Sequence, residues 1–303
     1  MARFTQYYFL LTTNQPETNM LDFTTINHTL EIPQNLDFCV AFEPTKIPDQ
    51  KYVVNAVTDK PFAIVGDGFK CATHRQFFEG VWQQITENMV DADIADAEVR
   101  FQSGRFGGFG MMDVQFPSVQ TTIETDSGHE TSIKQRVIAL HGVDGRTSNT
   151  TLFGSIDTFC TNGCISGEHS KIRRKNTSGF SLTNFISELR RAKNDFYLES
   201  ERLKVFAGTS LKTVDVAQLL EDIIPSKQKS RKMYELYQDE AATRGHNKFS
   251  LMSAFTNYAS HSLGNGFELR RTTNMDQKKA VTMLGREIEV NGWMSDQRFL
   301  EAA

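Results

Sequence analysis

Residues 97–142 read AEVRFQSGRFGGFGMMDVQFPSVQTTIETDSGHETSIKQRVIALHG, and the architecture of the chain depends chiefly on this stretch. It contains three runs with strand-like patterning, at 97–104, 109–124 and 130–142, and a fourth run, TLFGSIDTF, follows at 151–159. Turn-forming residues separate the runs: Gly107-Gly108, Asp126-Ser127-Gly128 and Asp144-Gly145. Strand-like runs joined by short glycine-containing turns predict an antiparallel β-meander of three to four strands.

Helical patterns flank the meander on both sides. Thr73 can cap a helix predicted from Thr73 to Met89, whose apolar side chains recur at helical spacing: Phe77, Phe78, Val81, Trp82 and Ile85. From about Ser181 a second pattern places one set of apolar residues on one face: Leu182, Phe185, Ile186, Leu189, Phe196 and Leu203. Further helices are expected at about 213–224, 231–244, 251–260 and 275–289. We therefore predict an α+β fold, with the meander packed on a long amphipathic helix and a helical C-terminal third.

The chain is expected to have three parts. Residues 1–70 alternate short apolar runs with turn residues and are punctuated by Pro33, Pro44, Pro48 and Pro61, which predicts a β-rich N-terminal segment. Residues 71–210 form the predicted helix–antiparallel sheet–helix core, and residues 211–303 form a helical C-terminal region.

The composition is that of an ordinary globular protein. The 303 residues are 39% hydrophobic and 23% charged, and no apolar run approaches the length that a bilayer span needs. The N-terminal residues make a poor secretory signal, so we expect a cytoplasmic protein with no membrane partner. Four cysteines in a chain of this length do not form a disulfide scaffold.

Positive charge is concentrated in the second half of a chain whose net charge is −4. One group lies within five residues, and a second lies on the helix that follows: Lys171, Arg173, Arg174 and Lys175, then Arg190, Arg191 and Lys193. A third group comprises Lys227, Lys229, Arg231 and Lys232. Such clusters can be ordinary solvated faces, but three of them in an acidic protein favour a polyanionic partner, with nucleic acid first.

The segment RFQSGRFGGFGMM at 100–112 alternates arginine and phenylalanine with glycine. Aromatic rings and guanidinium groups stack on unpaired bases, each stacked base contributing about 1–3 kcal/mol. We expect such contacts from Arg100, Arg105, Phe106 and Phe109. The alternative is a glycine-rich hairpin whose phenylalanines fill the core. The segment lacks the Gly-Lys-Ser/Thr ending of a phosphate-binding P-loop.

Motifs for catalysis are weak. Cys160, Cys164 and His169, or Cys71 and His74, could contribute to a zinc site, but neither cysteine set has Cys-x-x-Cys spacing. An acidic stretch could ligate magnesium or contact a basic face of a neighbouring subunit: Glu87, Asp91, Asp93, Asp96 and Glu98. Neither Gly-x-Ser-x-Gly nor His-Glu-x-x-His occurs. We therefore predict no catalytic residue, no metal site and no cofactor.

Two segments resemble a known family. IDTFCTNGCISG at 156–167 and LMSAFTNYASHSLGNGF at 251–267 resemble the phage- and plasmid-borne domain of unknown function numbered 932. In that family a Cys-(Thr)-Asn-Gly/Gln turn follows an antiparallel strand, and a helix of the pattern nAvTeyaSH lies nearer the C-terminus. The helix pattern is matched here by Ala254, Phe255, Thr256, Asn257, Tyr258, Ser260 and His261. The resemblance covers about residues 70–290 and implies a mobile-element setting, first of all a bacteriophage, without implying an activity.

The order of helix, antiparallel strands and long helix also resembles single-strand annealing proteins of the RecT and Red-beta kind. That resemblance is architectural and implies a ring or filament that holds single strands in a positively charged groove. We expect a phage protein that binds and anneals single-stranded DNA without hydrolysing nucleotides. The alternatives are a phage structural or interaction protein, such as an assembly factor or a host-defence inhibitor that binds an acidic partner, and a metal-dependent enzyme.

Overall fold

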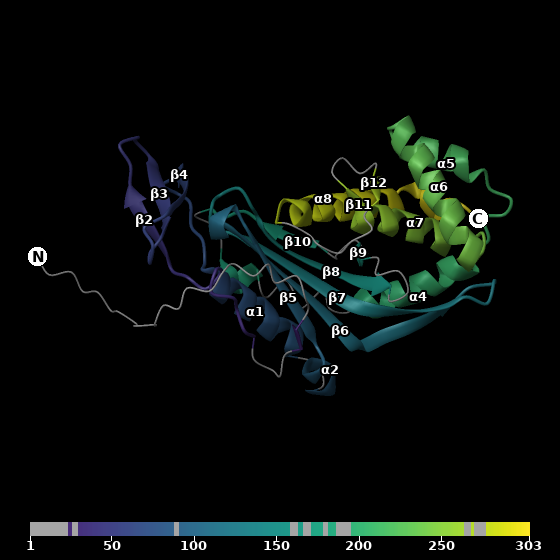
Figure 1. Ribbon diagram of the computed structural model, residues 1–303, viewed down its shortest axis with the longest axis horizontal. Helices are drawn as coiled ribbons and strands as arrows, with labels where there is room; N and C mark the ends of the chain where they lie inside the picture. The colour runs from purple at the N-terminus through teal and green to yellow at the C-terminus, as the bar shows by residue number, and fades with distance from the viewer. Residues whose placement is uncertain are drawn as a thin grey trace, which may run out of the picture.

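A seven-stranded antiparallel sheet forms the centre of the molecule (Figure 1). The computed structural model describes residues 24–25, 30–87, 91–157, 163–165, 171–177, 181–185, 195–263, 268–269 and 277–303. The strand order is β1-β5-β6-β7-β8-β10, and β9 also pairs with β8. The strands are β1 (Thr24–Thr25), β5 (Glu98–Gly104), β6 (Phe109–Glu124), β7 (Glu130–Gly142), β8 (Asn149–Asp157), β9 (Gly163–Ile165) and β10 (Lys171–Arg174). Since β5, β6, β7 and β8 are neighbours in chain order, the predicted meander is confirmed.

The long strand β6 is interrupted at a proline. Phe116 is opposite Gln135 and Gln120 is opposite Lys134, so residues 117–119 have no partners on β7. Proline has no N–H to donate to a ladder, and Pro117 therefore lies in a bulge. The helix that precedes the sheet covers one face ahead of the bulge, whereas the C-terminal helices pack beyond the bulge and also reach β5.

The part of the sheet ahead of the bulge packs against α1 (His74–Thr86). The Thr73 side chain accepts a hydrogen bond from the backbone of Gln76, and the Gln76 side chain accepts one from the backbone of Thr73, so the predicted cap is confirmed. The five apolar residues predicted for this helix are all buried on the sheet. They meet the side chains of alternate residues on the facing strands, among them Met112, Val114 and Phe116. A short helix, α2 (Asp91–Ala95), precedes β5.

The part of the sheet beyond the bulge packs against the C-terminal helices. These are α4 (Asp195–Gly208), α5 (Val216–Ile223), α6 (Lys227–Arg244), α7 (Lys248–His261), α8 (Gln277–Met294) and α9 (Gln297–Glu301). Ile123 of β6 and Ile133 of β7 join their common core, so the helices enclose the far end of the hairpin. The α+β class and the helical C-terminal third are confirmed.

The apolar face expected after Ser181 contributes to two cores. Phe185 belongs to the core between α1 and the sheet, whereas Leu203 of α4 belongs to the core of the C-terminal helices. Helix α4 packs on β6, β8 and α7. Residues 186–194, in the middle of the predicted helix, lie outside the described residues.

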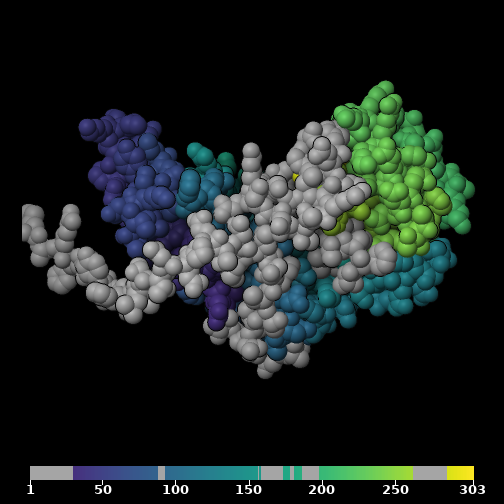
Figure 2. Space-filling view, viewed as in Figure 1, coloured from purple at the N-terminus to yellow at the C-terminus, as the bar shows by residue number. Residues whose placement is uncertain are grey.

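A separate three-stranded sheet protrudes at the opposite end from the C-terminal helices (Figure 2). It consists of β2 (Val40–Pro44), β3 (Gln50–Asn55) and β4 (Pro61–Gly66). Leu30, Ile32 and Leu36, which precede it, are buried in the core beside α1. The division of the chain at residues 70 and 210 stays a prediction. The remaining strands, β11 (Ser262–Leu263) and β12 (Glu268–Leu269), form a small ladder, and no helix in the described part of the chain has the length and apolarity of a membrane span.

Candidate nucleic-acid interface

Three chain segments meet at one end of the large sheet, which we call the loop end. The turn η1 (Arg105–Gly107) joins β5 to β6, and residues 143–148 join β7 to β8. Arg174, the last residue of β10, is opposite Asn149, the first residue of β8. A strand spacing of about 4.8 Å places β10 about 14 Å from β6 across the sheet. The η1 turn lies beside β4, and the register of β10 with β8 brings residues 173–174 to the same end of the large sheet (Figure 1).

A pair of buried asparagines holds the end of β10 in place. The Asn149 Nδ2 group donates to Asn176 Oδ1 at 2.6 Å, and Asn176 Nδ2 donates to the Gly142 carbonyl at 2.6 Å. Both amides are buried, so each bond also satisfies a polar group that has left water. The contacts fix residues 173–175 relative to β7 and β8.

The cations of β10 are exposed but do not share one face. Arg173, Arg174 and Lys175 are all exposed. Arg173 is opposite Thr150 and Arg174 is opposite Asn149, so the two arginines leave opposite faces of the sheet. Residue Lys171 lies in the same strand, and its side chain is outside the described part. The β10 cations therefore form a rim around the sheet edge instead of a single flat patch.

Two further cations at this end were not predicted from the sequence. Arg146 lies in the β7–β8 loop and is exposed, and Lys60 lies in the β3–β4 turn beside η1. Within the described residues, Arg146, Arg173 and Lys175 make no ion pair. Both Lys60 and Arg146 are isolated in sequence, and Asp59 and Asp144 lie close to them in the chain. A search for local charge clusters therefore passes over both residues.

The η1 turn has an unusual backbone. Arg105 and Phe106 have φ of 52° and 56°, and Gly107 has φ of 90°. Side chains make this left-handed region unfavourable, and it is rare at two successive residues other than glycine. The Arg105 guanidinium donates to Asp144 and to Thr147 of the β7–β8 loop, which compensates part of that cost.

A buried pair of histidines contacts the backbone of the η1 turn. His74 of α1 contacts the Gly107 carbonyl through Nε2 at 2.8 Å, and its Nδ1 lies 2.9 Å from Nδ1 of His141. A carbonyl only accepts, so His74 Nε2 carries the proton, and His141 Nδ1 must donate to His74 Nδ1. Burial lowers the pKa of His74 to about 4, against the opposing effect of the Gly107 bond. Burial also lowers the pKa of His141 well below its ordinary value, so both rings are neutral.

The four residues expected to contact bases occupy different environments. Phe106 is 85% exposed, whereas Phe109 is 3% exposed and packs with Met111, Ile138 and other apolar residues. A ring buried to that extent cannot stack on a base without opening the sheet. The expected base contact therefore fits Phe106 and does not fit Phe109.

Arg100 also points into the protein. Its Nη2 group lies 2.5 Å from Asp113 Oδ2, and Arg136 donates to both oxygens of the same carboxylate, at 2.8 and 2.9 Å. Arg136 also donates to Glu287 of α8 at 3.1 Å. Burial would raise the pKa of Asp113, but the two arginines outweigh it and lower the value to about 2. The buried network joins β5, β6 and β7 to α8, which gives Arg100 a structural role in place of the expected surface contact.

The other basic clusters contribute less to this surface. Arg190, Arg191 and Lys193 lie outside the described residues. In the third group Lys229 is bonded to Glu289 at 2.6 Å, and Lys232 to Glu235 at 3.0 Å. These carboxylates of the same chain neutralise part of the positive charge on α6.

The described residues offer no group of three or more histidine, cysteine or carboxylate side chains that could hold a metal ion. His74, one of the zinc candidates, uses both ring nitrogens in hydrogen bonds. Burial raises the pKa of the Cys71 thiol to about 12. Cys160 and His169 lie outside the described residues, as does the side chain of Cys164.

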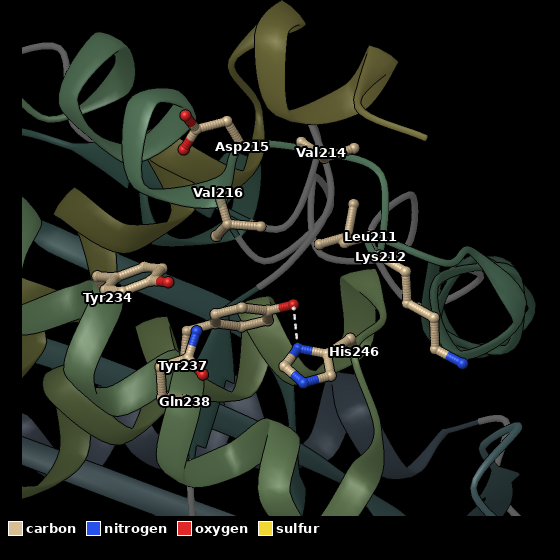
Figure 3. A pocket seen from close by; sticks show the side chains of 9 residues that line it. All are labelled: Leu211, Lys212, Val214, Asp215, Val216, Tyr234, Tyr237, Gln238 and His246. Atoms are coloured by element: carbon tan, nitrogen blue, oxygen red, sulfur yellow. Dashed lines mark hydrogen bonds between the residues drawn. The ribbon is translucent and has the colours of Figure 1, made fainter.

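A hollow of about 270 Å³ lies among the C-terminal helices (Figure 3). The Tyr237 hydroxyl and His246 Nδ1 face each other in it at 3.2 Å. Burial raises the pKa of Tyr237 to about 12, so its hydroxyl stays protonated and can donate to His246. These two groups satisfy one another, and the polar side chains of Lys212, Asp215 and Gln238 also line the hollow.

Comparisons with known protein families, with curated proteins and with solved structures find no match. The resemblances to the domain of unknown function 932 and to annealing proteins therefore stay predictions. The helix that carries one of them is α7, where Ala254, Phe255 and Tyr258 are core residues. These three residues of the pattern therefore have a packing role in this fold.

Proposed function

We propose that the protein binds single-stranded DNA through the phosphates of the strand, at the loop end of the large sheet. The observation that carries this proposal is the convergence of exposed cations from two separate segments. Arg146 comes from the β7–β8 loop, and Arg173 and Lys175 come from β10 and the residue after it. Cations spaced along a sheet edge can follow a sugar-phosphate chain.

Binding of this kind supports annealing. Contacts to phosphates leave base edges free to pair, and neutralised strands repel one another less. Annealing therefore needs no catalytic residue and no nucleotide hydrolysis. We place the activity in recombination of a mobile element such as a bacteriophage, in the cytoplasm of its host. We further propose that several copies assemble into a ring or filament and so lengthen the cationic rim.

The test is the salt dependence of binding to a labelled single-stranded oligonucleotide. If Arg146, Arg173 and Lys175 each neutralise one phosphate, log Kobs falls against log salt with a slope of about −2. The charge reversals Arg173→Glu and Lys175→Glu together should make the slope shallower by about 1.4. The control is Lys212→Glu, which makes the same kind of charge change at an exposed lysine near the C-terminal helices. A flat wild-type salt profile, or equal effects of the two sets of changes, would overturn the proposal.

A second candidate is an interaction protein that binds an acidic protein partner. The β2–β4 segment favours it, because five large apolar side chains are exposed there: Phe42, Ile47, Tyr52, Val57 and Ile64. Polyglutamate of matched charge separates the two candidates. If it competes as well as single-stranded DNA, the cations serve an acidic polypeptide.

A further inference from the structure

We propose that Phe106 stacks on an unpaired nucleobase, and that this contact makes the protein prefer single strands to duplexes. The inference rests on the proposed function and adds a base contact to the phosphate contacts. In a duplex the bases are already stacked on one another, so a protruding ring gains a stacking partner only where a strand is unpaired.

The exposure of Phe106 is the first reason. Its side chain is 85% exposed, the highest value among the large apolar residues in the described part of the chain. A phenylalanine ring in water forgoes about 1.5–3 kcal/mol of burial free energy. The adjacent turn residues find partners inside the protein, so the exposure is specific to Phe106.

The rigidity of the turn is the second reason. Arg105 is bonded to Asp144 and Thr147, and the Gly107 carbonyl is bonded to His74. Two backbone bonds add to this, from Gly108 N to the Arg105 carbonyl at 3.0 Å and from Val143 N to the Gly108 carbonyl at 3.0 Å. A ring that is held in place before binding loses little conformational entropy when a base covers it.

The position of Lys60 is the third reason. Its ammonium group lies 5.1 Å from the centre of the Phe106 ring, over one face. The cation is attracted to the π electrons of that face and leaves the opposite face for a base. The residue pair therefore offers a positive charge on one side of the ring and a free π surface on the other.

The experiment compares an ordinary single strand with an abasic strand of the same length, which keeps the phosphates and lacks the bases. For Phe106→Ala we expect the Kd for the ordinary strand to rise about 5- to 140-fold. The Kd for the abasic strand should not change. Phe106→Leu, which keeps an apolar side chain without a ring, should resemble the alanine variant. Because the side chain is exposed, circular dichroism and the melting temperature should match those of the wild type.

A direct readout comes from Phe106→Trp. Trp82 and Trp293 are 6% and 7% exposed, so they respond weakly to a ligand at the surface. We expect fluorescence of the variant to be quenched by the ordinary strand in a saturable way, and not by the abasic strand.

Each result has one meaning. If the wild type binds both strands with a steep salt dependence, and Phe106→Ala or Phe106→Leu leaves ordinary-strand binding unchanged, phosphate binding stands and base stacking is overturned. If the wild type binds neither strand, the proposed function and this inference both fail.

Discussion

Nδ1 of His141 lies 2.9 Å from Nδ1 of His74, and both imidazoles are fully buried. The contact joins β7 to α1, and His74 extends it to the carbonyl of Gly107 in the η1 turn. These contacts determine where the protons lie. The Gly107 carbonyl can only accept, so His74 donates from Nε2, and His141 must donate from Nδ1 to His74 Nδ1. His141 Nε2 has no partner among the described residues. The pair therefore supports an exposed turn only while both rings are neutral.

Stability should fall on acidification because of these two histidines. Both folded-state pKa values lie below the unfolded value of about 6.5, so the unfolded state binds more protons below that pH. The free energy of unfolding should decrease as pH falls from about 6.5 toward 4. Replacing His141 by Phe should make this slope shallower by up to about 1.4 kcal/mol per pH unit.

Urea denaturation at a series of pH values measures the slope. Phe77→Leu is the matched control, because Phe77 stacks on His141 at 4.7 Å and does not titrate. It should lower stability by a similar amount at every pH. Equal slopes for His141→Phe and the wild type would contradict the assignment of neutral rings.

Asp113→Asn should be one of the most destabilising substitutions in the sheet. The carboxylate is fully buried and is bonded to Arg100 and Arg136, so removal of its charge takes a buried ionic partner from both arginines, although Arg136 keeps its bond to Glu287. We expect a loss of about 3–5 kcal/mol in the free energy of unfolding. The control Asp37→Asn removes the exposed pair with Arg75 and should cost less than about 1 kcal/mol. Similar losses for the two variants would show that the buried network contributes little.

Gly107→Ala should disturb the η1 turn. Gly107 has φ of +90°, and a Cβ there would lie 3.0 Å from the Phe38 ring and 3.1 Å from the Asn35 carbonyl. Gly128→Ala is a control with φ of +77° and no atom within 4 Å of the added Cβ. The control should show only the backbone cost, about 1–2 kcal/mol, and Gly107→Ala should cost more by thermal denaturation. An equal loss would mean that the surroundings of Gly107 yield to the added methyl group.

Asn176→Ala should release the end of β10. It removes the partner of Asn149 Nδ2 and of the Gly142 carbonyl, each of which would be left buried and unsatisfied. We expect a loss of about 1–3 kcal/mol in stability and weaker binding of single-stranded DNA, because Arg173 and Lys175 lose their fixed positions. Thr177→Ala changes the exposed neighbouring residue and should affect neither quantity. If Asn176→Ala binds single-stranded DNA as tightly as the wild type, the asparagine pair does not position the cations for binding.

The acidic stretch tests the proposed assembly. Asp93 and Asp96 are half-buried, and Asp96 accepts a hydrogen bond from Ser118. If the stretch contacts a basic face of a neighbouring copy, charge reversal at Asp91, Asp93 and Asp96 should reduce the mass measured by light scattering. An unchanged mass would contradict the proposed contact between copies of the protein.

The sequence by itself determined the elements that depend on local signals. Strand-like runs and short turns predicted β5 to β8, and Thr73 predicted the start of α1, because alternation and capping involve residues a few positions apart. The exact bounds of later helices differed by a few residues. Helix α6, for example, begins at Lys227 because Ser226 caps it, four residues before the predicted start.

Only the tertiary structure decided which residues of the glycine-rich segment reach the surface. Phe106 and Phe109 look alike in sequence, but a left-handed turn directs one ring outward while the strand buries the other. Arg100 does not reach the surface, because it binds the buried carboxylate of Asp113, which Arg136 also binds. Arg146 lies near the β10 cations because of the register between β8 and β10. Burial and charge compensation depend on partners far apart in the chain, and local patterns in a single sequence carry no record of those partners.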